Sequence, residues 1–139
     1  MDQFMKVINL YKCYGDKKVV NNISFEIMRG EILCFLGPNG AGKSTTINIL
    51  AGVLGADGGE IHYKGNRMQD AKKEYQYHLG VVPQDLALYE DLTAMQNVRF
   101  FASLYGLKGK ERCEKADKAL SFVGLRERKD QKVKTFSGG

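Results

Sequence analysis

Residues 37–44 read GPNGAGKS, and this glycine-rich stretch decides the fold. The residues just before it, 31–36 (EILCFL), form an apolar run typical of a strand buried on both faces, as in parallel sheets. After it, apolar residues recur at helical spacing from Ile47 to Leu54, which predicts a helix beginning at or near Lys43. Strand, loop and helix in this order predict an α/β fold whose loop presents backbone amides to a phosphate group.

The residue types within the loop favour a nucleoside triphosphate as the ligand. Gly37, Gly40 and Gly42 permit backbone conformations and close approaches that a side chain would block. Lys43 supplies a positive charge for the β- and γ-phosphates, and Ser44 supplies a hydroxyl for Mg²⁺. A dinucleotide site is disfavoured, because no Gly-x-Gly-x-x-Gly opens the predicted helix.

The first part of the chain is predicted to be rich in strands. Residues 3–10 and 18–27 alternate as half-buried strands do, and the turn at 14–16 separates them. Residues 60–64 form a short strand, and residues 79–82 are predicted to be a second strand of the buried type.

The pattern becomes helical after Gln84. Thr93 followed by Gln96 predicts a capping box at the start of one helix, and a second helix is predicted from about Lys108 to Val123. The residues predicted to face inward are Met95, Val98, Ala102, Tyr105, Cys113, Ala116, Leu120 and Val123.

Composition narrows the class of protein further. The 139 residues suffice for one domain, and no apolar run reaches the length that spans a bilayer. The net charge of +5 is spread among acidic residues, which disfavours a nucleic-acid partner. The three cysteines lack metal-ligand spacing and indicate reduced thiols in the cytoplasm, with Cys34 expected in the core.

Taken together, these motifs resemble the nucleotide-binding domain of ABC (ATP-binding cassette) ATPases. Residues 37–46 read GPNGAGKSTT, a form common in that family and especially in its exporter-type subunits. Further matches are YGD at 14–16, VPQ at 82–84, LYEDLT at 88–93 and FSGG at 136–139, with Phe136 where leucine is commonest.

The resemblance implies an ABC-type P-loop NTPase fold with an incomplete sheet. It implies an antiparallel β subdomain and P-loop core over residues 1–85. A partial helical subdomain would follow over residues 86–139 and end in the signature motif.

The resemblance also implies ATP and Mg²⁺ as ligands and assigns roles to individual residues. Tyr14 would stack on adenine, although Tyr11 is a competing candidate. Gln84 would reach Mg²⁺ and the attacking water, and Ser44 would also bind the metal. Lys43 and Gln84 are the implied catalytic residues. The implied nucleotide contacts are Tyr14, Asn39, Gly40, Ala41, Gly42, Lys43, Ser44, Thr45, Ser137, Gly138 and Gly139, the last three toward the ATP of a second subunit.

Hydrolysis in this family uses an apolar Walker B strand ending in Asp, then a catalytic Glu and later a switch histidine. Residues 1–139 contain no such pair, and His62 and His78 match neither position. The chain resembles the first half of a cassette, so it is expected to bind ATP and to hydrolyse it negligibly. The strand at 31–36 is then expected to lack neighbours and to expose an edge.

The implied partners are a transmembrane permease subunit, met by residues 86–135, and a second ATP-binding subunit. The protein would then be cytoplasmic and peripheral at the inner face of the membrane. Two alternatives stay open: a soluble ABC ATPase of translation or DNA maintenance, and a regulatory nucleotide-binding module. The form of residues 37–46 suggests export, and no residue indicates the transported substrate.

Overall fold

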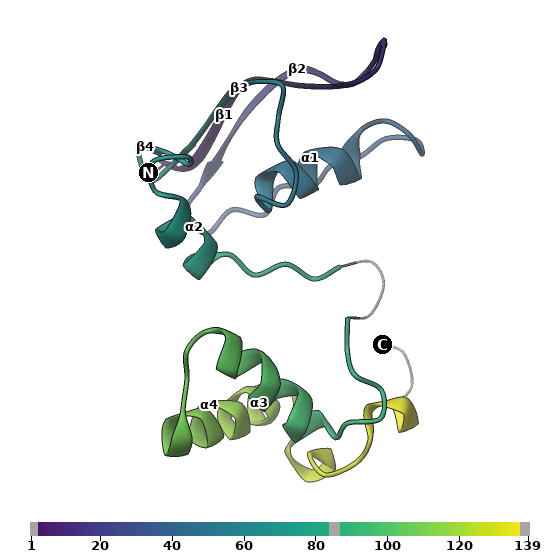
Figure 1. Cartoon of the computed structure of the whole chain (residues 1–139), viewed down its shortest axis with the longest axis vertical. Coiled ribbons are helices and arrows are strands. Elements are labelled where there is room, and N and C mark those ends of the chain that lie inside the picture. The colour runs from purple at the N-terminus through teal and green to yellow at the C-terminus, as the bar shows by residue number, and fades with distance from the viewer. Residues whose placement is uncertain (1–2, 84–86, 137–139) are drawn as a thin grey trace. The chain divides into compact units, whose positions relative to one another are not determined.

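A computed structural model describes residues 3–83 and 87–136 and divides the chain into two compact units, Met1–Val81 and Val82–Gly139 (Figure 1). The first unit carries a sheet and two short helices, and the second is helical. Over the described ranges, every helix is too short or too polar to cross a membrane.

The sheet of the first unit is antiparallel, with β1 (Gln3–Tyr14) near its centre. β1 pairs with β2 (Lys17–Met28) on one side and with β3 (Gly58–Tyr63) on the other. The short β4 (Asn66–Arg67) follows β3, which gives the order β2-β1-β3-β4. The predicted strands at 3–10, 18–27 and 60–64 are therefore confirmed, with the first two longer than expected and the third shifted toward the N-terminus.

Two helices cover this unit's core. The α1 helix (Lys43–Leu50) begins where the sequence predicted and buries Ile49 against the sheet. The α2 helix (Lys72–His78), which the sequence pattern did not delimit, buries Tyr75, whose hydroxyl donates to the carbonyl of Leu50. The core is built from Met5, Val7, Leu10, Val20, Ile49, Ile61, Tyr63 and Tyr75.

The two strands predicted as buried on both faces are absent from the described sheet. Residues 31–36 and 79–82 have no regular secondary structure, and Ile32 and Leu36 are 89% and 91% exposed. Apolar residues form such a strand only when neighbouring strands pair with their backbone, and no described strand does so here. The expectation that Cys34 is a core residue is wrong for the same reason, because its side chain is exposed.

The second unit consists of α3 (Ala94–Leu104), α4 (Gly109–Phe122) and the 3-10 turns Arg126–Arg128 and Val133–Thr135. The predicted capping box is confirmed. The hydroxyl of Thr93 accepts from the Gln96 amide at 3.1 Å, and the Gln96 side chain accepts from the Thr93 amide at 2.8 Å.

The predicted inner face of these helices is only partly right. Ala116 and Leu120 are buried, whereas Tyr105 and Val123 are exposed. Each of the exposed pair is the C-cap residue that precedes a glycine of positive φ, so the chain leaves helical periodicity there.

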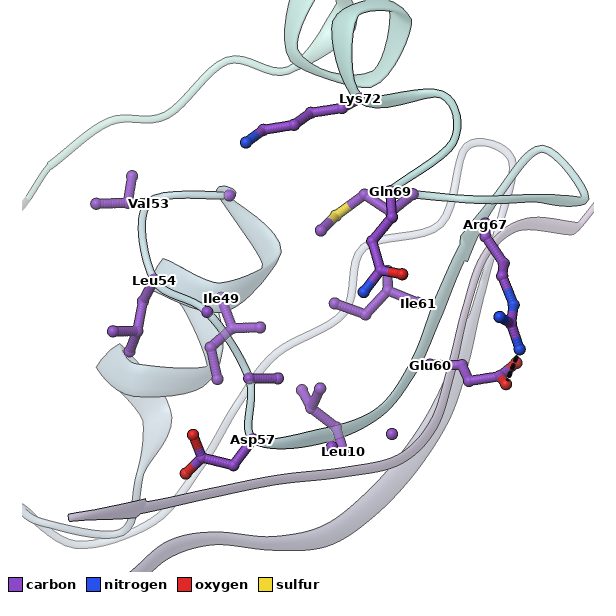
Figure 2. A pocket seen from close by; sticks show the side chains of 16 residues that line it. Leu10, Ile49, Val53, Leu54, Asp57, Glu60, Ile61, Arg67, Gln69 and Lys72 are labelled. Atoms are coloured by element: carbon purple, nitrogen blue, oxygen red, sulfur yellow. Dashed lines mark hydrogen bonds and ion pairs between the residues drawn. The ribbon is translucent and has the colours of Figure 1, made fainter.

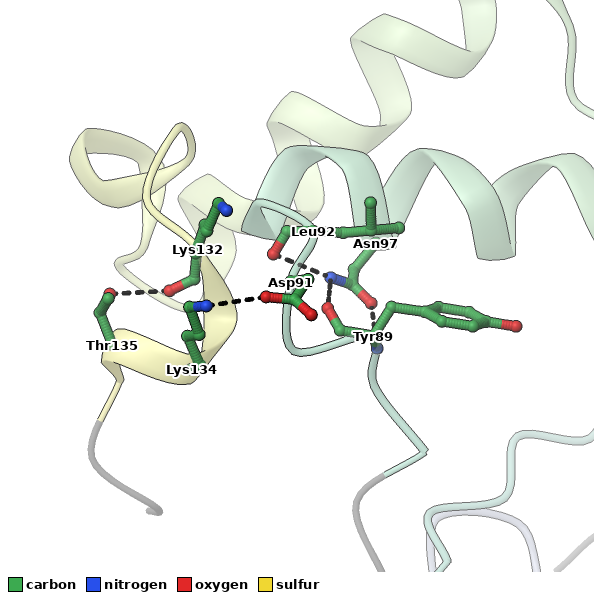
Figure 3. A network of polar contacts seen from close by, with 7 residues as sticks. All are labelled: Tyr89, Asp91, Leu92, Asn97, Lys132, Lys134 and Thr135. Carbon is green, nitrogen blue, oxygen red and sulfur yellow. Dashed lines mark hydrogen bonds and ion pairs between the residues drawn. The ribbon is translucent and has the colours of Figure 1, made fainter.

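Asn97 organises the loop that leads into α3 (Figure 3). Asn97 is buried, with only 2% of its surface exposed. Its amide group donates to the carbonyls of Tyr89 at 2.9 Å and Thr93 at 3.1 Å, and its carbonyl accepts from the Tyr89 amide at 2.8 Å. One buried side chain therefore satisfies both ends of the loop.

The loop held by Asn97 binds the end of the described chain. The amide of Val133 donates to the carbonyl of Leu92 at 3.0 Å, and the amide of Lys134 donates to that of Glu90 at 3.1 Å. The Lys134 ammonium also lies 2.8 Å from the Asp91 carboxylate. This ion pair holds the pKa of Asp91 below its ordinary value and raises that of Lys134.

Gly42, the residue just before α1, must be glycine for two reasons, its backbone conformation and the lack of space for a side chain. Gly42 has a φ of 84°, and a Cβ built on it would lie 2.3 Å from the carbonyl oxygen of Val19 in β2. Gly40 has nearly the same φ of 83°, yet a Cβ there would meet nothing within 4 Å.

We expect Asn97→Ala to lower the free energy of unfolding by about 2–3 kcal/mol, because it removes the side-chain hydrogen bonds that hold the loop and leaves the Tyr89 amide without its acceptor. Urea denaturation measures the change. Lys118→Ala, at an exposed position on α4, is the control and should change stability by less than about 0.5 kcal/mol. Equal stability of the two variants would contradict the role of Asn97.

The glycine pair gives a second prediction. Alanine at either position adopts the left-handed conformation at a cost of about 1–2 kcal/mol. Gly42→Ala also forces the backbone of α1 or β2 to move, so it should destabilise the chain clearly more than Gly40→Ala in urea denaturation. If the two variants unfold at the same urea concentration, the loop does not pack against β2 as described.

Candidate functional site

The side chain of Lys43, the first residue of α1, folds back onto the loop that precedes the helix. The ammonium of Lys43 donates to the carbonyl oxygens of Gly37 at 2.6 Å and Pro38 at 2.8 Å. These acceptors are neutral, and hydrogen bonds from an ammonium to a charged oxygen are stronger. An anion in the loop would therefore offer Lys43 better acceptors than the loop's own carbonyls.

The start of α1 provides open backbone donors beside this ammonium. Among the described residues, the amides of Lys43, Ser44 and Thr45 have no backbone acceptor, as expected for a first helical turn. The positive end of the helix dipole lies at the same place. The arrangement fits a phosphate group.

The side chains of the first turn have different surroundings. The Ser44 side chain is exposed, and its hydroxyl has no protein partner within the described ranges. Thr46 is buried, and its hydroxyl donates to the carbonyl of Gly42 at 2.9 Å. Ser44 is therefore available to an outside ligand such as a phosphate-bound Mg²⁺, whereas Thr46 stabilises the loop. The sequence pattern had not separated these two roles.

The remaining loop residues named from the sequence, Asn39, Gly40 and Ala41, are exposed. The Ala41 amide donates to the carbonyl of Pro38 at 3.3 Å, which closes the turn. The loop is thus tightly wound while its outer surface stays accessible.

Tyr14 lies at the hairpin that joins β1 to β2. It is the last residue of β1, pairs with Lys17 across the hairpin and is 52% exposed. Val19, two residues farther along β2, is the contact of Gly42. The fold therefore brings the aromatic side chain and the phosphate loop to one end.

Tyr11, the competing aromatic candidate, has different surroundings. A Cβ built on Gly58 would lie 2.1 Å from the Tyr11 ring, so this ring packs closely against the backbone of β3. Tyr11 is 36% exposed. The ring of Tyr14 is the more accessible of the two.

Four residues named from the sequence, Gln84, Ser137, Gly138 and Gly139, lie outside the described residues.

Asp57 is a residue that sequence patterns did not single out. It stands in the stretch GADGG at residues 55–59, a composition typical of a turn. Its carboxylate accepts from the Cys13 amide and the Lys12 ammonium, each at 2.7 Å. The bonds from Lys12 and Cys13 hold the pKa of Asp57 below its ordinary value. No periodicity signals such a contact, because the partners are more than 40 residues apart in sequence.

A cavity of about 610 Å³ lies between the end of α1 and β3 (Figure 2). Ile49, Leu54 and Ile61 form apolar walls, and Gln69 and Lys72 lie on another side. None of the residues 37–45 lines it. This cavity is therefore separate from the phosphate loop.

The chain is similar to known ATP-binding proteins over nearly all of its length. The linearmycin resistance ATP-binding protein LnrL of Bacillus subtilis is 44% identical over 131 residues, which are 94% of this chain and 42% of that protein. The Nod factor export ATP-binding protein I of Cupriavidus metallidurans is 34% identical over 100% of this chain and 46% of its own length. The chain thus spans less than half of either relative.

Solved structures give the same result for the fold. The ADP conformation of MJ1267, an ATP-binding cassette of an ABC transporter, superposes with a TM-score of 0.82 at 28% identity. The match covers 99% of this chain and 60% of that one. The expected α/β P-loop fold with its antiparallel β part is thereby confirmed.

The family model described as ABC transporter matches residues 20–139, which include the phosphate loop and both helices of the second unit. The chain therefore belongs to the ABC transporter family.

Proposed function

We propose that this chain is part of the ATP-binding subunit of an ABC export system, and that its phosphate loop holds ATP. The observation that carries the proposal is the Lys43 ammonium, which lies on the carbonyls of Gly37 and Pro38 beside the open amides of α1. Phosphate oxygens would replace those carbonyls. Members of this family are ATPases, which agrees with that ligand.

The nucleotide would be held at both of its ends. Lys43 and the loop amides would bind the β- and γ-phosphates, and Ser44 would ligate Mg²⁺. The ring of Tyr14 would stack on the adenine face, which needs no hydrogen bond. Gln84 would complete the metal site, and Ser137, Gly138 and Gly139 would face the ATP of a second ATP-binding subunit, as the family resemblance implies.

Export is supported by the relatives, of which one is a linearmycin resistance protein and another a Nod factor export protein. ATP-binding subunits of transporters act with membrane permease subunits. The second unit exposes Tyr89, Phe100 and Leu104, side chains suited to an apolar protein partner. The subunit would then work at the inner face of the membrane through its permease.

Titration with a fluorescent ATP analogue tests ATP binding. The 139-residue chain should bind in the presence of Mg²⁺, and Lys43→Ala should weaken binding at least about tenfold, because a charge-assisted contact is lost. Lys73→Ala removes the same charge from the exposed face of α2 and is the control, with affinity expected to stay within about twofold. Equal affinities of the two variants would exclude this site.

Hydrolysis gives a separate test. Attack by water needs a positioned nucleophile and carboxylates around Mg²⁺, and residues 1–139 contain no Asp-Glu pair. We expect phosphate release by this chain at the background rate while ATP remains bound. Steady turnover that disappears in Lys43→Ala would refute the expectation.

A further inference from the structure

Asp57 forms hydrogen bonds with three consecutive residues near the end of β1, Tyr11, Lys12 and Cys13. Its own amide donates to the carbonyl of Tyr11 at 3.1 Å. Its two carboxylate oxygens accept separately, one from the Lys12 ammonium and the other from the Cys13 amide, each at 2.7 Å. A single residue in the turn after α1 therefore contacts three successive residues of β1.

The α1 helix and the turn after it connect the phosphate loop to Asp57. Asp57 lies in the turn between α1 and β3, and α1 begins at Lys43. A helix of this length is a stiff rod of about 12 Å. Ile49 anchors the rod in the core, and residues 51–57 lead from its end to Asp57.

The end of β1 has few other supports. Leu10 is the last fully buried residue of the strand, and pairing with β3 ends at Tyr11 opposite Gly58. Residues 12–14 pair only with β2 among the described strands. The side chain of Lys12 is only 15% exposed, and its ammonium lies 5.7 Å from the centroid of the Tyr14 ring. The ion pair with Asp57 thus also holds the cation beside that ring.

We propose that Asp57 is a positioning residue for nucleotide binding, which fixes the Tyr14 ring relative to the phosphate loop so that one nucleotide engages both. The inference rests on the function proposed above for Tyr14 and Lys43. The ribose and the phosphate chain limit the distance between the base and the terminal phosphates, so a ring held within that range binds the base at a lower entropic cost. Without Asp57 the phosphate contacts remain and the base contact is lost.

A comparison of two ligands separates positioning from a general structural role. Calorimetric affinities for Mg-ATP and for Mg²⁺-bound inorganic tripolyphosphate, which has no base, are measured on the 139-residue chain. Asp57→Ala should weaken ATP binding about fivefold, as expected for one lost ring contact. It should change tripolyphosphate affinity less than about twofold. Asp70→Ala, at an exposed carboxylate of the same unit, should change neither.

Two further variants complete the test. Asp57→Asn keeps an acceptor for the Cys13 amide and loses the charge facing Lys12, so its effect on ATP should be intermediate. It also decides the question if Asp57→Ala does not fold. In a Tyr14→Ala background, Asp57→Ala should cause no additional loss of ATP affinity, because the contact that it positions is already gone.

The outcomes distinguish this inference from the proposed function. Equal losses for both ligands, or additive losses with Tyr14→Ala, would overturn the role of Asp57. A selective loss in Tyr14→Ala that neither Asp57 variant reproduces would also overturn it and leave the proposed function intact. Insensitivity of both ligands to Lys43→Ala would instead refute the phosphate site itself.

Discussion

The close approach of Gly42 to the carbonyl of Val19 is the constraint on which the first unit depends. It joins the start of α1 to β2 without a side chain between them. With the helix start fixed, Ile49 reaches the core formed by β1 and β3, and the loop before the helix closes on the Lys43 ammonium. Core packing and the geometry of the ligand site therefore share one steric cause.

The second unit is stabilised by a different principle. Its helices bury few large side chains, and the loop before α3 relies on hydrogen bonds to Asn97. Such buried polar contacts specify one arrangement because any other leaves backbone groups unpaired. The loop then forms backbone hydrogen bonds with residues 131–134, so the start of α3 and the last described turn are held together.

Sequence patterns predicted the parts of the fold that depend on neighbours in the chain. Alternation in β1 and β2, the glycine-rich start of α1 and the Thr93 capping box are all local signals, and all are confirmed. Residues 31–36 carry an equally clear apolar signal, yet a strand needs a partner that the run itself does not contain. The apolar pattern therefore predicted a strand that does not form among the described residues, whereas the family resemblance had predicted that this segment would lack neighbours.

The candidate site divides in the same way. Lys43 and Ser44 follow from a compact motif, because the loop and the helix start are adjacent in sequence. Asp57 contacts Cys13 and Lys12, which precede it in the sequence by 44 and 45 positions. An aspartate among glycines is by itself typical only of a turn. The choice between Tyr11 and Tyr14 likewise needs the packing of one ring against Gly58, which no spacing rule contains.

The exposed segment 31–36 also governs how the protein behaves at high concentration. Its apolar side chains match the composition of aggregation-prone strands, it contains no proline, and none of the described strands pairs with its backbone. The charged Arg29 lies just before it, and residues 37–42, which follow it, carry no charge. Capture by a neighbouring strand of the same molecule is independent of concentration, whereas pairing with another copy grows with it. Association through this stretch of backbone therefore follows mass action and increases with protein concentration.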